Sequence, residues 1–521
     1  MRNLRFSRLY SNIIRRKNAT LPLNAYNYTS TRWKRTSAGY FGSIYNPPNY
    51  KVENEELNDS IRCCISGYEK DDHKSYTKDT GMSICFLGTS SGVPTRHRST
   101  SATLLRLGGS SFLFDAGEGC QRQLAFTRAK PSHIERIFIT HLHGDHIFGL
   151  PGFLLGLQLS IMSKKGDGKS SKKKKKIAED HVVKIYGPPG LYNYIASNII
   201  LSCTKFHSLS IEVYELVGSR VRRIHGGNGI KNPFEANYPE FNYGFIKKKS
   251  IFPENGIWNI QALQPITRQS ILTNNKHIGG SDRVRIKAAE VDHLPGVVCF
   301  GFMVEEQEPP RNVDPNRAKK LGVMPTGKKY ELLKYGFSVQ SENGETVQPK
   351  EVWQPVNKRA RKITIVGDNR GWTPQMKEIS QNSDVLIQEA TLTGTKEDRV
   401  RGHSTATMAG RVSGDANASL LVLNHISSKS DRSDKEGNNN QRKLIADAEK
   451  ASEGKSDVLV AHDFMEILVP WKGFRAPDNE ESSQTLNSGD TIVSSTPTEE
   501  ALNAAKTVKE WFGKNEDTAS N

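Results

Sequence analysis

The sequence has no long uninterrupted apolar run, since no stretch of the 521 residues approaches 18 consecutive apolar side chains. That absence predicts that no helix crosses a membrane and that the protein needs no membrane partner. Cysteine is also scarce, and the six cysteines form no CxxC pair. This spacing excludes a zinc ribbon and argues against a disulfide framework, so the cysteines are predicted to be thiols in a reducing compartment.

Acidic residues are missing from the start of the chain. Residues 1–52 contain ten Lys or Arg and no Asp or Glu, with Ser, Thr, Asn and Tyr between them. This composition is typical of an organelle transit peptide and predicts a mitochondrial location, with a plastid as the second choice. The alternative is a basic arm that contacts RNA, in which case the protein would be nuclear or cytosolic. Removing these ten cations lowers the formal net charge from +17 to +7, which is compatible with a polyanionic substrate.

Composition divides the rest of the chain. Residues 53–80 are polar and patternless, which indicates a linker, and a single domain is expected over 81–475. Residues 163–180 are a low-complexity insertion whose lysine run, 172–176, is interpreted as a solvated surface segment. The tail, 476–521, has nine acids against three lysines and is expected to be mostly disordered. A capping box at Thr496 predicts one helix within it, over 497–513.

Strand and helix patterns alternate through the central domain, which predicts an α/β fold. Residues 215–280 have a weak pattern and are interpreted as an irregular insertion. Residues 305–340 are rich in Pro and Lys and are expected to project from the core. The expected strands are 84–87, 112–114, 137–140, 182–186, 284–288, 297–304, 363–366, 385–387, 420–423 and 458–460, and the expected helices are 148–162, 188–201, 404–412 and 442–451.

The segment richest in chemical information is His141-Leu142-His143-Gly144-Asp145-His146, directly after the apolar run 137–140. A loop at the end of a buried strand can hold such side chains in fixed positions. Imidazole nitrogens and carboxylate oxygens suit Zn²⁺. His141 and His143 can face one metal ion, while Asp145 and His146 face a second ion beside it. The segment therefore predicts a metal site with room for two ions.

Three further polar groups stand where apolar runs end. His293 follows strand 284–288, Asp368 follows strand 363–366, and His425 follows strand 420–423. Taken singly, each would more often be a capping or surface residue. Because all three follow the histidine-rich segment along the chain, they are predicted to complete the two-metal site.

The order of these motifs resembles the metallo-β-lactamase superfamily and, more specifically, the tRNase Z family of short-form type, which trims precursor-tRNA 3′ trailers. The resemblance covers about 83–475 and implies a four-layer αβ/βα sandwich with a protruding tRNA-binding arm. The segments that carry it, besides the histidine-rich one, are Gly88–Thr95 with Arg98-Ser99, Phe114–Gln123, Gln388–Thr391, His403–Thr405 and Asn424–Ser427.

The resemblance implies a role for each matched residue. One zinc ion would be held by His141, His143, His293 and Asp368, and a second by Asp145, His146, Asp368 and His425, although Mn²⁺ or another divalent ion is an alternative. His403 would be the general acid, with Glu389 orienting its ring, and Asp145 would also serve as a base for the attacking water. Asp115 and Glu118 are interpreted as loop-fixing groups.

The implied substrate is precursor tRNA, and the family implies a homodimer. The arm would be residues 304–340, with phosphate contacts from Lys319, Lys320, Lys328, Lys329 and Lys334. The family's Gly-Pro pair is replaced here by Pro325–Tyr330, and a polar stretch follows Ser427 to about Gln441. Two other functions stay open on the sequence: a thioesterase of the glyoxalase II kind with the same fold, and a non-catalytic RNA-binding protein.

Overall fold

A computed structural model describes residues 81–165, 181–207, 209–218, 246–273, 280–355, 359–392, 402–430, 440–469 and 492–494. The predicted N-terminal extension 1–52, the linker 53–80, the lysine run 172–176 and the tail helix 497–513 lie outside these residues.

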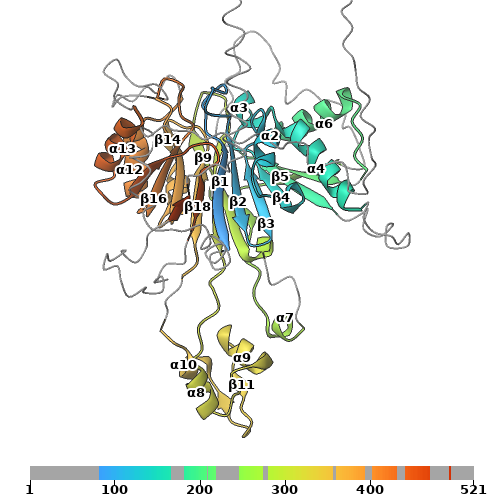
Figure 1. Cartoon of the computed structure of the whole chain (residues 1–521), viewed down its shortest axis with the longest axis vertical. Coiled ribbons are helices and arrows are strands. Elements are labelled where there is room, and N and C mark those ends of the chain that lie inside the picture. Colours follow the sequence, from blue (N-terminus) through green and yellow to red (C-terminus); the bar gives the residue numbers. More distant parts are fainter. Residues whose placement is uncertain are drawn as a thin grey trace, which may run out of the picture. The chain divides into compact units, whose positions relative to one another are not determined.

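Two mixed β-sheets form the body (Figure 1). The first has the strand order β19-β18-β1-β2-β3-β4-β5-β6-β7, in which β3 to β7 run parallel to one another. Its strands are β1 (Met82–Gly88), β2 (Ala102–Leu107), β3 (Ser110–Phe114), β4 (Ile134–Phe138), β5 (Val182–Gly187), β6 (Ser210–Leu216), β7 (Ile246–Ile251), β18 (Glu466–Leu468) and β19 (Ile492–Ser494).

The second sheet has the order β14-β9-β10-β13-β15-β16-β17, and β8 pairs with β9 beside this path. Strands β13, β15, β16 and β17 are parallel. The strands are β8 (Ile257–Gln261), β9 (Val284–Asp292), β10 (Cys299–Glu306), β13 (Lys362–Val366), β14 (Gly371–Trp372), β15 (Val385–Glu389), β16 (Leu420–Asn424) and β17 (Asp457–Val460).

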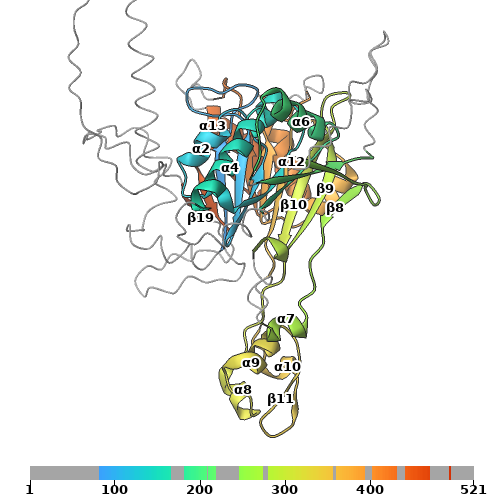
Figure 2. The same ribbon diagram turned by 90° about the vertical axis from the view of Figure 1, so that its right-hand side faces the viewer.

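Helices cover the outer face of each sheet (Figures 1 and 2). The first sheet is covered by α2 (Cys120–Ala125), α4 (Leu150–Lys165) and α6 (Leu191–Leu201), with α3 (Gly144–Ile147) leading into α4 and a 3-10 turn at Pro131–His133. The second sheet is covered by α11 (Pro374–Ser380), α12 (Ala406–Asp415) and α13 (Asn440–Ala451), and a 3-10 turn at Gly280–Arg283 precedes β9.

Three apolar cores separate these four layers. The central core lies between the sheets and joins Phe112, Phe114 and Phe138 of the first sheet to Phe300 and Phe302 of the second. One outer core packs α4 and α6 on the first sheet, and the other packs α11, α12 and α13 on the second. Burial of these side chains, at roughly 25 cal/mol per Å² of apolar surface, stabilises the stack. The predicted α/β class and the αβ/βα layering are confirmed.

The edge of the body that carries the predicted site residues is set by strand direction. β9 and β13 both pair antiparallel with β10, so they run the same way as β15 and β16. Parallel strands end at one edge of a sheet, and His293, Asp368 and His425 follow β9, β13 and β16 there. The turn after β4 of the facing sheet brings His141 to the same edge.

A small segment packs apart from both sheets, as both views show (Figures 1 and 2). It has its own apolar core, which includes Leu332, Leu333 and Val352 and extends to Trp353, so this arm is longer than the predicted range 304–340. Its elements are α7 (Arg268–Leu272), α8 (Pro315–Lys320), α9 (Gly327–Lys334), β11 (Val339–Gln340), β12 (Thr346–Val347) and α10 (Pro349–Val352).

The structure corrects one prediction from the sequence. The region 215–280 is predicted to be irregular, but its described part contains β7, β8 and α7. The apolar pattern of this region is weak because β7 carries three lysines in succession. In addition, β8 lies beside the main path of the second sheet, where it pairs with β9. Of the tail 476–521, the structure describes only Ile492–Ser494, which form β19 and pair antiparallel with β18, so the prediction for the rest of the tail stays a prediction.

One helical stretch, Gly144–Ser163, is long and apolar enough by length and composition to cross a membrane. The core helices of globular proteins pass the same test, and here Phe153, Leu154 and Leu157 pack against the first sheet. This stretch does not form an uninterrupted apolar run in the sequence, because glycine, glutamine and serine lie between its apolar residues.

Candidate active site

Seven side chains from both sheets converge at one edge of the body. His141, His143, Asp145 and His146 lie on the turn between β4 and α4, where His143 is the N-cap of α3. His293, Asp368 and His425 come from the second sheet. The start of α4 lies close to the loop after β3, because a Cβ at Gly149 would collide with the carbonyl oxygen of Gly117. That close approach requires glycine and holds the turn against the first sheet.

Two groups of potential ligand atoms form within this cluster. His141, His143, His293 and Asp368 offer atoms that all lie within 4.8 Å of one another. The Nδ1 atom of His143 stands 3.0 Å from Nε2 of His141 and 3.3 Å from Nε2 of His293. The lone pairs of two ring nitrogens at this distance repel each other unless a proton or a cation lies between them, so the arrangement suits a shared cation.

The second group contains Asp145, His146 and His425. Nε2 of His425 stands 3.2 Å from Nε2 of His146 and 3.1 Å from Oδ2 of Asp145. Asp368 lies between the groups, because its Oδ2 is 3.8 Å from Nε2 of His141 and 3.4 Å from Nε2 of His146. The structure thus brings together all seven residues that the sequence predicted as ligands.

Outer hydrogen bonds fix which ring nitrogen faces inward. The hydroxyl of Thr140 donates to Asp115, so it accepts from Nδ1–H of His141. The hydroxyl of Thr391 donates to the carbonyl of His425 and accepts from the Nδ1–H of the same residue. These bonds leave the Nε2 lone pairs directed into the cluster, which is the state that binds metal.

Two further rings, those of His146 and His293, are fixed in the same manner. Nδ1–H of His146 donates to Oδ2 of Asp115 at 2.7 Å, and Nδ1–H of His293 donates to the carbonyl of Gly402 at 2.6 Å. Gly402 has φ +72°, and a Cβ there would stand 2.7 Å from Leu294. This inward set of nitrogen and carboxylate atoms fits divalent zinc. Asp115 fixes the loop, as predicted, rather than joining the cluster.

Burial and charge set the protonation of the cluster. Burial lowers the pKa of His141 well below its usual range and also lowers the pKa of His143 and His293. Burial opposes the charge of Asp368, yet His425 and His146 hold its pKa well below the usual range. Neutral rings beside ionised carboxylates are the forms that ligate a metal ion. His146 differs, because burial opposes its charge but Asp368 and Asp115 raise its pKa well above the usual range, so a metal ion that bound this ring would displace a proton.

A histidine–glutamate pair adjoins the cluster, and His403 also forms a third group of potential ligand atoms with Asp368 and His425. Nδ1 of His403 is 3.1 Å from both carboxylate oxygens of Glu389, which is buried at the end of β15. The backbone N–H of Asn369 also donates to Glu389, so the carboxylate is held from two sides. Burial lowers the pKa of His403, but the hydrogen bond and charge of Glu389 raise it overall, to about 9. The ring can therefore carry a proton at neutral pH.

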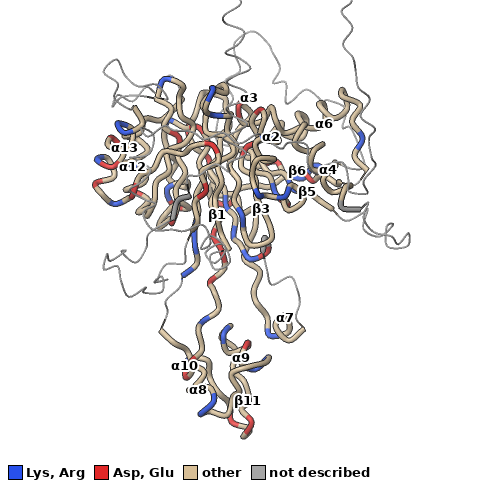
Figure 3. The backbone as a smooth tube through the Cα atoms, in the orientation of Figure 1, with Lys and Arg blue, Asp and Glu red and all other residues tan. Residues whose placement is uncertain are grey.

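The predicted phosphate-contacting lysines all lie on the arm, along whose backbone both basic and acidic residues occur (Figure 3). Lys319, Lys320 and Lys329 are exposed. Lys328 is engaged within the arm, because its ammonium donates to the carbonyl of Ile271 at 2.7 Å and pairs with Glu331. Lys334 stands 5.0 Å over the ring of Tyr330.

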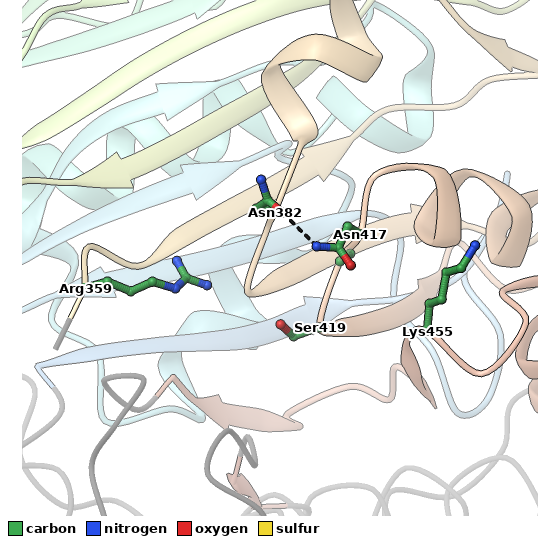
Figure 4. A pocket seen from close by; sticks show the side chains of 6 residues that line it. Arg359, Asn382, Asn417, Ser419 and Lys455 are labelled. Carbon is green, nitrogen blue, oxygen red and sulfur yellow. Dashed lines mark hydrogen bonds between the residues drawn. The ribbon is translucent and has the colours of Figure 1, made fainter. Parts of the chain in front are cut away.

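A polar pocket lies away from this cluster, at the opposite ends of the second sheet's strands (Figure 4). Asn382 and Asn417, both with positive φ, end α11 and α12, and the Asn417 amide donates to Asn382. Arg359 and Lys455 stand beside these helix C-termini, whose carbonyls carry partial negative charge. Arg359 also pairs with Asp384. The pocket is explained by helix termination and needs no ligand.

Several known proteins are similar to this chain. Residues 82–165 match the family model described as anti-Pycsar protein Apyc1. The chain is 34% identical over 402 residues to zinc phosphodiesterase ELAC protein 1 of Homo sapiens, an alignment that spans 75% of this chain and 99% of the relative. It is 29% identical over 355 residues to ribonuclease Z of Streptococcus uberis, spanning 67% and 90%. It is also similar to the crystal structure of the human short-form tRNase Z (25% identity, TM-score 0.44, 74% and 98% covered).

Proposed function

Because the chain belongs to the ribonuclease Z family, which includes zinc phosphodiesterase ELAC protein 1, we propose that it is an endoribonuclease that removes the 3′ trailer from precursor tRNA. The reaction is hydrolysis of one phosphodiester bond, and the tRNA keeps its 3′-hydroxyl. The observation that carries this function is the pairing of the seven-residue cluster with the His403–Glu389 pair. Thioester hydrolysis and non-catalytic RNA binding have no such support from the relatives' names.

The cluster is proposed to hold two zinc ions, with Mn²⁺ as an alternative. His141, His143 and His293 would hold one ion, Asp145, His146 and His425 the other, and Asp368 would contact both. When bound, such ions lower the pKa of water at the site and neutralise charge on the phosphoryl group. The chain's own contribution is to fix the ligand rings through Thr140, Thr391, Asp115 and Gly402.

Proton transfer is proposed to divide between two side chains. His403, protonated through Glu389, would donate a proton to the departing 3′ oxygen of the tRNA. Asp145 would accept a proton from the attacking water. Burial opposes its ionisation, but the hydrogen bond from His425 and the charge of His146 lower its pKa, so the carboxylate is ready to accept.

The proposed function is tested with the full chain and a precursor tRNA that carries a 3′ extension. We expect one cut, after the nucleotide that precedes the trailer, and loss of that cut when a chelator removes the metal. A thioester substrate in the same preparation serves as the comparison. Thioester hydrolysis without RNA cleavage would replace the nuclease with the glyoxalase II-like alternative, and RNA binding with neither reaction would favour the non-catalytic one.

The arm is proposed to grip the tRNA body through phosphates. Reversing the charge of Lys319 and Lys320 together should raise KM for precursor tRNA about tenfold and reduce the salt slope of binding by about 2, since each lost phosphate contact releases one counterion fewer. Cleavage of bis(p-nitrophenyl) phosphate, which has no tRNA body, should not change. The control is Lys328→Met, which removes an ammonium already used inside the arm. An equal salt slope in the wild type and the double variant would reject the contact.

The arm and the cluster lie at opposite ends of the strands. β10 runs from the cluster edge to Glu306, and eight residues at about 3.3 Å each span roughly 26 Å. A substrate that contacts both elements must span at least this distance. An exposed apolar stripe on α4 supports a homodimer by offering a surface for it: Leu155, Leu159 and Met162 are 38%, 49% and 42% exposed.

Replacing Leu155 and Leu159 with arginine should convert the proposed dimer to a monomer, because charged side chains in a self-complementary apolar contact repel each other. Sedimentation would report a halved mass. Phe252→Arg is the control, since that side chain is 71% exposed but follows β7, the last strand at one edge of the first sheet. A wild type that is already monomeric at micromolar concentration, or a double variant that stays dimeric, would rule out this interface.

The location is proposed to be mitochondrial, and only the composition of residues 1–52 supports it. A fluorescent protein carrying residues 1–60 should be imported into mitochondria. Plastid import would select the second address, and diffuse cytosolic signal would remove the transit-peptide interpretation.

A further inference from the structure

We propose that Asp463, a half-buried carboxylate on the turn between β17 and β18, is a positioning residue that sets the loop 89–99 against the metal cluster. The proposal rests on the proposed function of the cluster, but its tests do not all need RNA. Asp463 is far from the cluster in sequence and contacts none of the seven clustered side chains in a described hydrogen bond. Its influence would pass through the loop.

Asp463 binds both ends of the loop. Its Oδ1 accepts a hydrogen bond from the hydroxyl of Thr89 at 2.8 Å, and its Oδ2 accepts one from the backbone N–H of Ser99 at 2.7 Å. Oδ2 also accepts from the side-chain amide of Gln123 at 3.0 Å, which in turn donates to the carbonyl of Leu87. One side chain therefore joins β1, the far end of the loop and α2.

Arg98 reinforces the same anchor. Its guanidinium is buried, donates to the hydroxyl of Thr89 at 2.7 Å and donates to the carbonyl of Ala461, two residues before Asp463. It also stands 3.3 Å from Nδ1 of His462. A buried arginine and a half-buried carboxylate that share the Thr89 hydroxyl form a polar network, in which each member loses partners if the loop moves.

The anchored loop touches the cluster at two points. The N–H of Ser91 donates to the carbonyl of Ile426 at 3.2 Å, and the N–H of Ile426 donates to the carbonyl of Thr89 at 2.8 Å, directly beside His425. At its tip, the N–H of Gly92 donates to Oδ2 of Asp145 at 2.8 Å. That bond orients the carboxylate proposed to hold the second metal ion and to accept a proton. Displacement of the loop would therefore alter Asp145 and leave the three histidines of the first group in place.

The chemistry of the anchor requires a carboxylate. Both oxygens of Asp463 accept hydrogen bonds. An asparagine would replace one of these acceptors with an NH₂ donor, which would face either the hydroxyl of Thr89 or the N–H groups of Ser99 and Gln123. Burial raises the pKa of Asp463 to about 6, although Ser99, Thr89 and Arg98 each oppose that rise. The anion is therefore stable only while the loop supplies its donors, which ties the loop's position to this residue.

The test compares Asp463→Asn with Asp384→Asn. Asp384 is the control because its carboxylate likewise accepts from two donors, Lys362 and Arg359, and is buried, but it lies at the opposite end of β15 from the cluster. Zinc titration with a chromophoric competitor should show two ions per chain in the wild type and the control. In Asp463→Asn, affinity for one ion should fall about 10–100-fold, the range for residues that orient a ligand, while the other ion stays tight.

Kinetics on bis(p-nitrophenyl) phosphate should separate the same variants. The kcat should be reduced in Asp463→Asn, with partial recovery in excess zinc, and unchanged in Asp384→Asn. Thr89→Val, which removes one donor and keeps the buried volume, covers the case in which Asp463→Asn does not fold; it should weaken the same ion to a smaller extent. The proposal is overturned if both ions keep wild-type affinity in a folded variant, or if the two aspartate variants lose zinc equally. Failure of the wild type to cut tRNA would instead reject the proposed function.

Discussion

Replacing Asp368 with alanine should empty both halves of the metal cluster and lower kcat/KM for precursor tRNA by roughly 10⁴-fold, since bound ions supply several kcal/mol of charge stabilisation and each 1.36 kcal/mol is tenfold. The side chain is buried and its oxygens lie within 3.4–3.8 Å of His141, His146, His403 and His425. Without it, the four rings lose a carboxylate that faces them all, and the two groups of potential ligands lose the residue that lies between them.

The measurement is zinc per chain by mass spectrometry of the metal, beside the cleavage assay. Asp292→Asn is the control: this residue precedes His293, but its carboxylate is 62% exposed and pairs with Arg370 at the surface. It should keep its zinc and its activity. An Asp368 variant that binds two ions, or that loses activity while keeping both, would show that the residue does not connect the groups.

Replacing His403 with alanine should lower kcat on precursor tRNA by about 10²–10⁴-fold while leaving the zinc content unchanged, because a general acid contributes in that range. His403 forms a group of potential ligand atoms with Asp368 and His425, but not with His141 or His146. Its ring is held by Glu389 and not by the hydrogen bonds that orient the metal-facing rings. Glu389→Gln should give a smaller loss in the same direction, since an amide does not stabilise a protonated ring.

A leaving group that needs no proton separates this role from a structural one. On bis(p-nitrophenyl) phosphate the departing p-nitrophenolate is already stable as an anion, so His403→Ala should lose little of its rate. An equal loss on both substrates would show that His403 acts on metal binding or on the site's shape instead of donating a proton.

The sequence predicts the clustered residues well because their signal is local. Each is a polar side chain directly after an apolar strand, and strand direction alone then carries His293, Asp368 and His425 to one edge. Asp463 has the same signal, since it follows β17 within Ala461–Phe464. Sequence position does not tell a ligand from an anchor, because the difference is which donors face the carboxylate in three dimensions.

Features that depend on distant partners could not be predicted. Thr140 and Thr391 orient metal-facing rings, yet a threonine after a strand is ordinary in any sequence. Composition predicts that the arm projects and the resemblance implies its role, but its helices are not predicted, because its small core is built from scattered residues such as Val313, Leu333 and Val352. Helices this short depend on tertiary packing more than on local pattern.

The two borders of the nine-stranded sheet have a consequence for how the protein behaves at high concentration. A border strand offers unpaired backbone groups that can template pairing with another molecule and start aggregation. At one border β19 occupies that position beside β18. At the other, β7 carries Lys247, Lys248 and Lys249 in succession, so an incoming copy of β7 would place ammonium groups side by side. The lysines that weaken the apolar pattern of β7 in the sequence thus also disfavour the pairing of another chain with this border of the sheet.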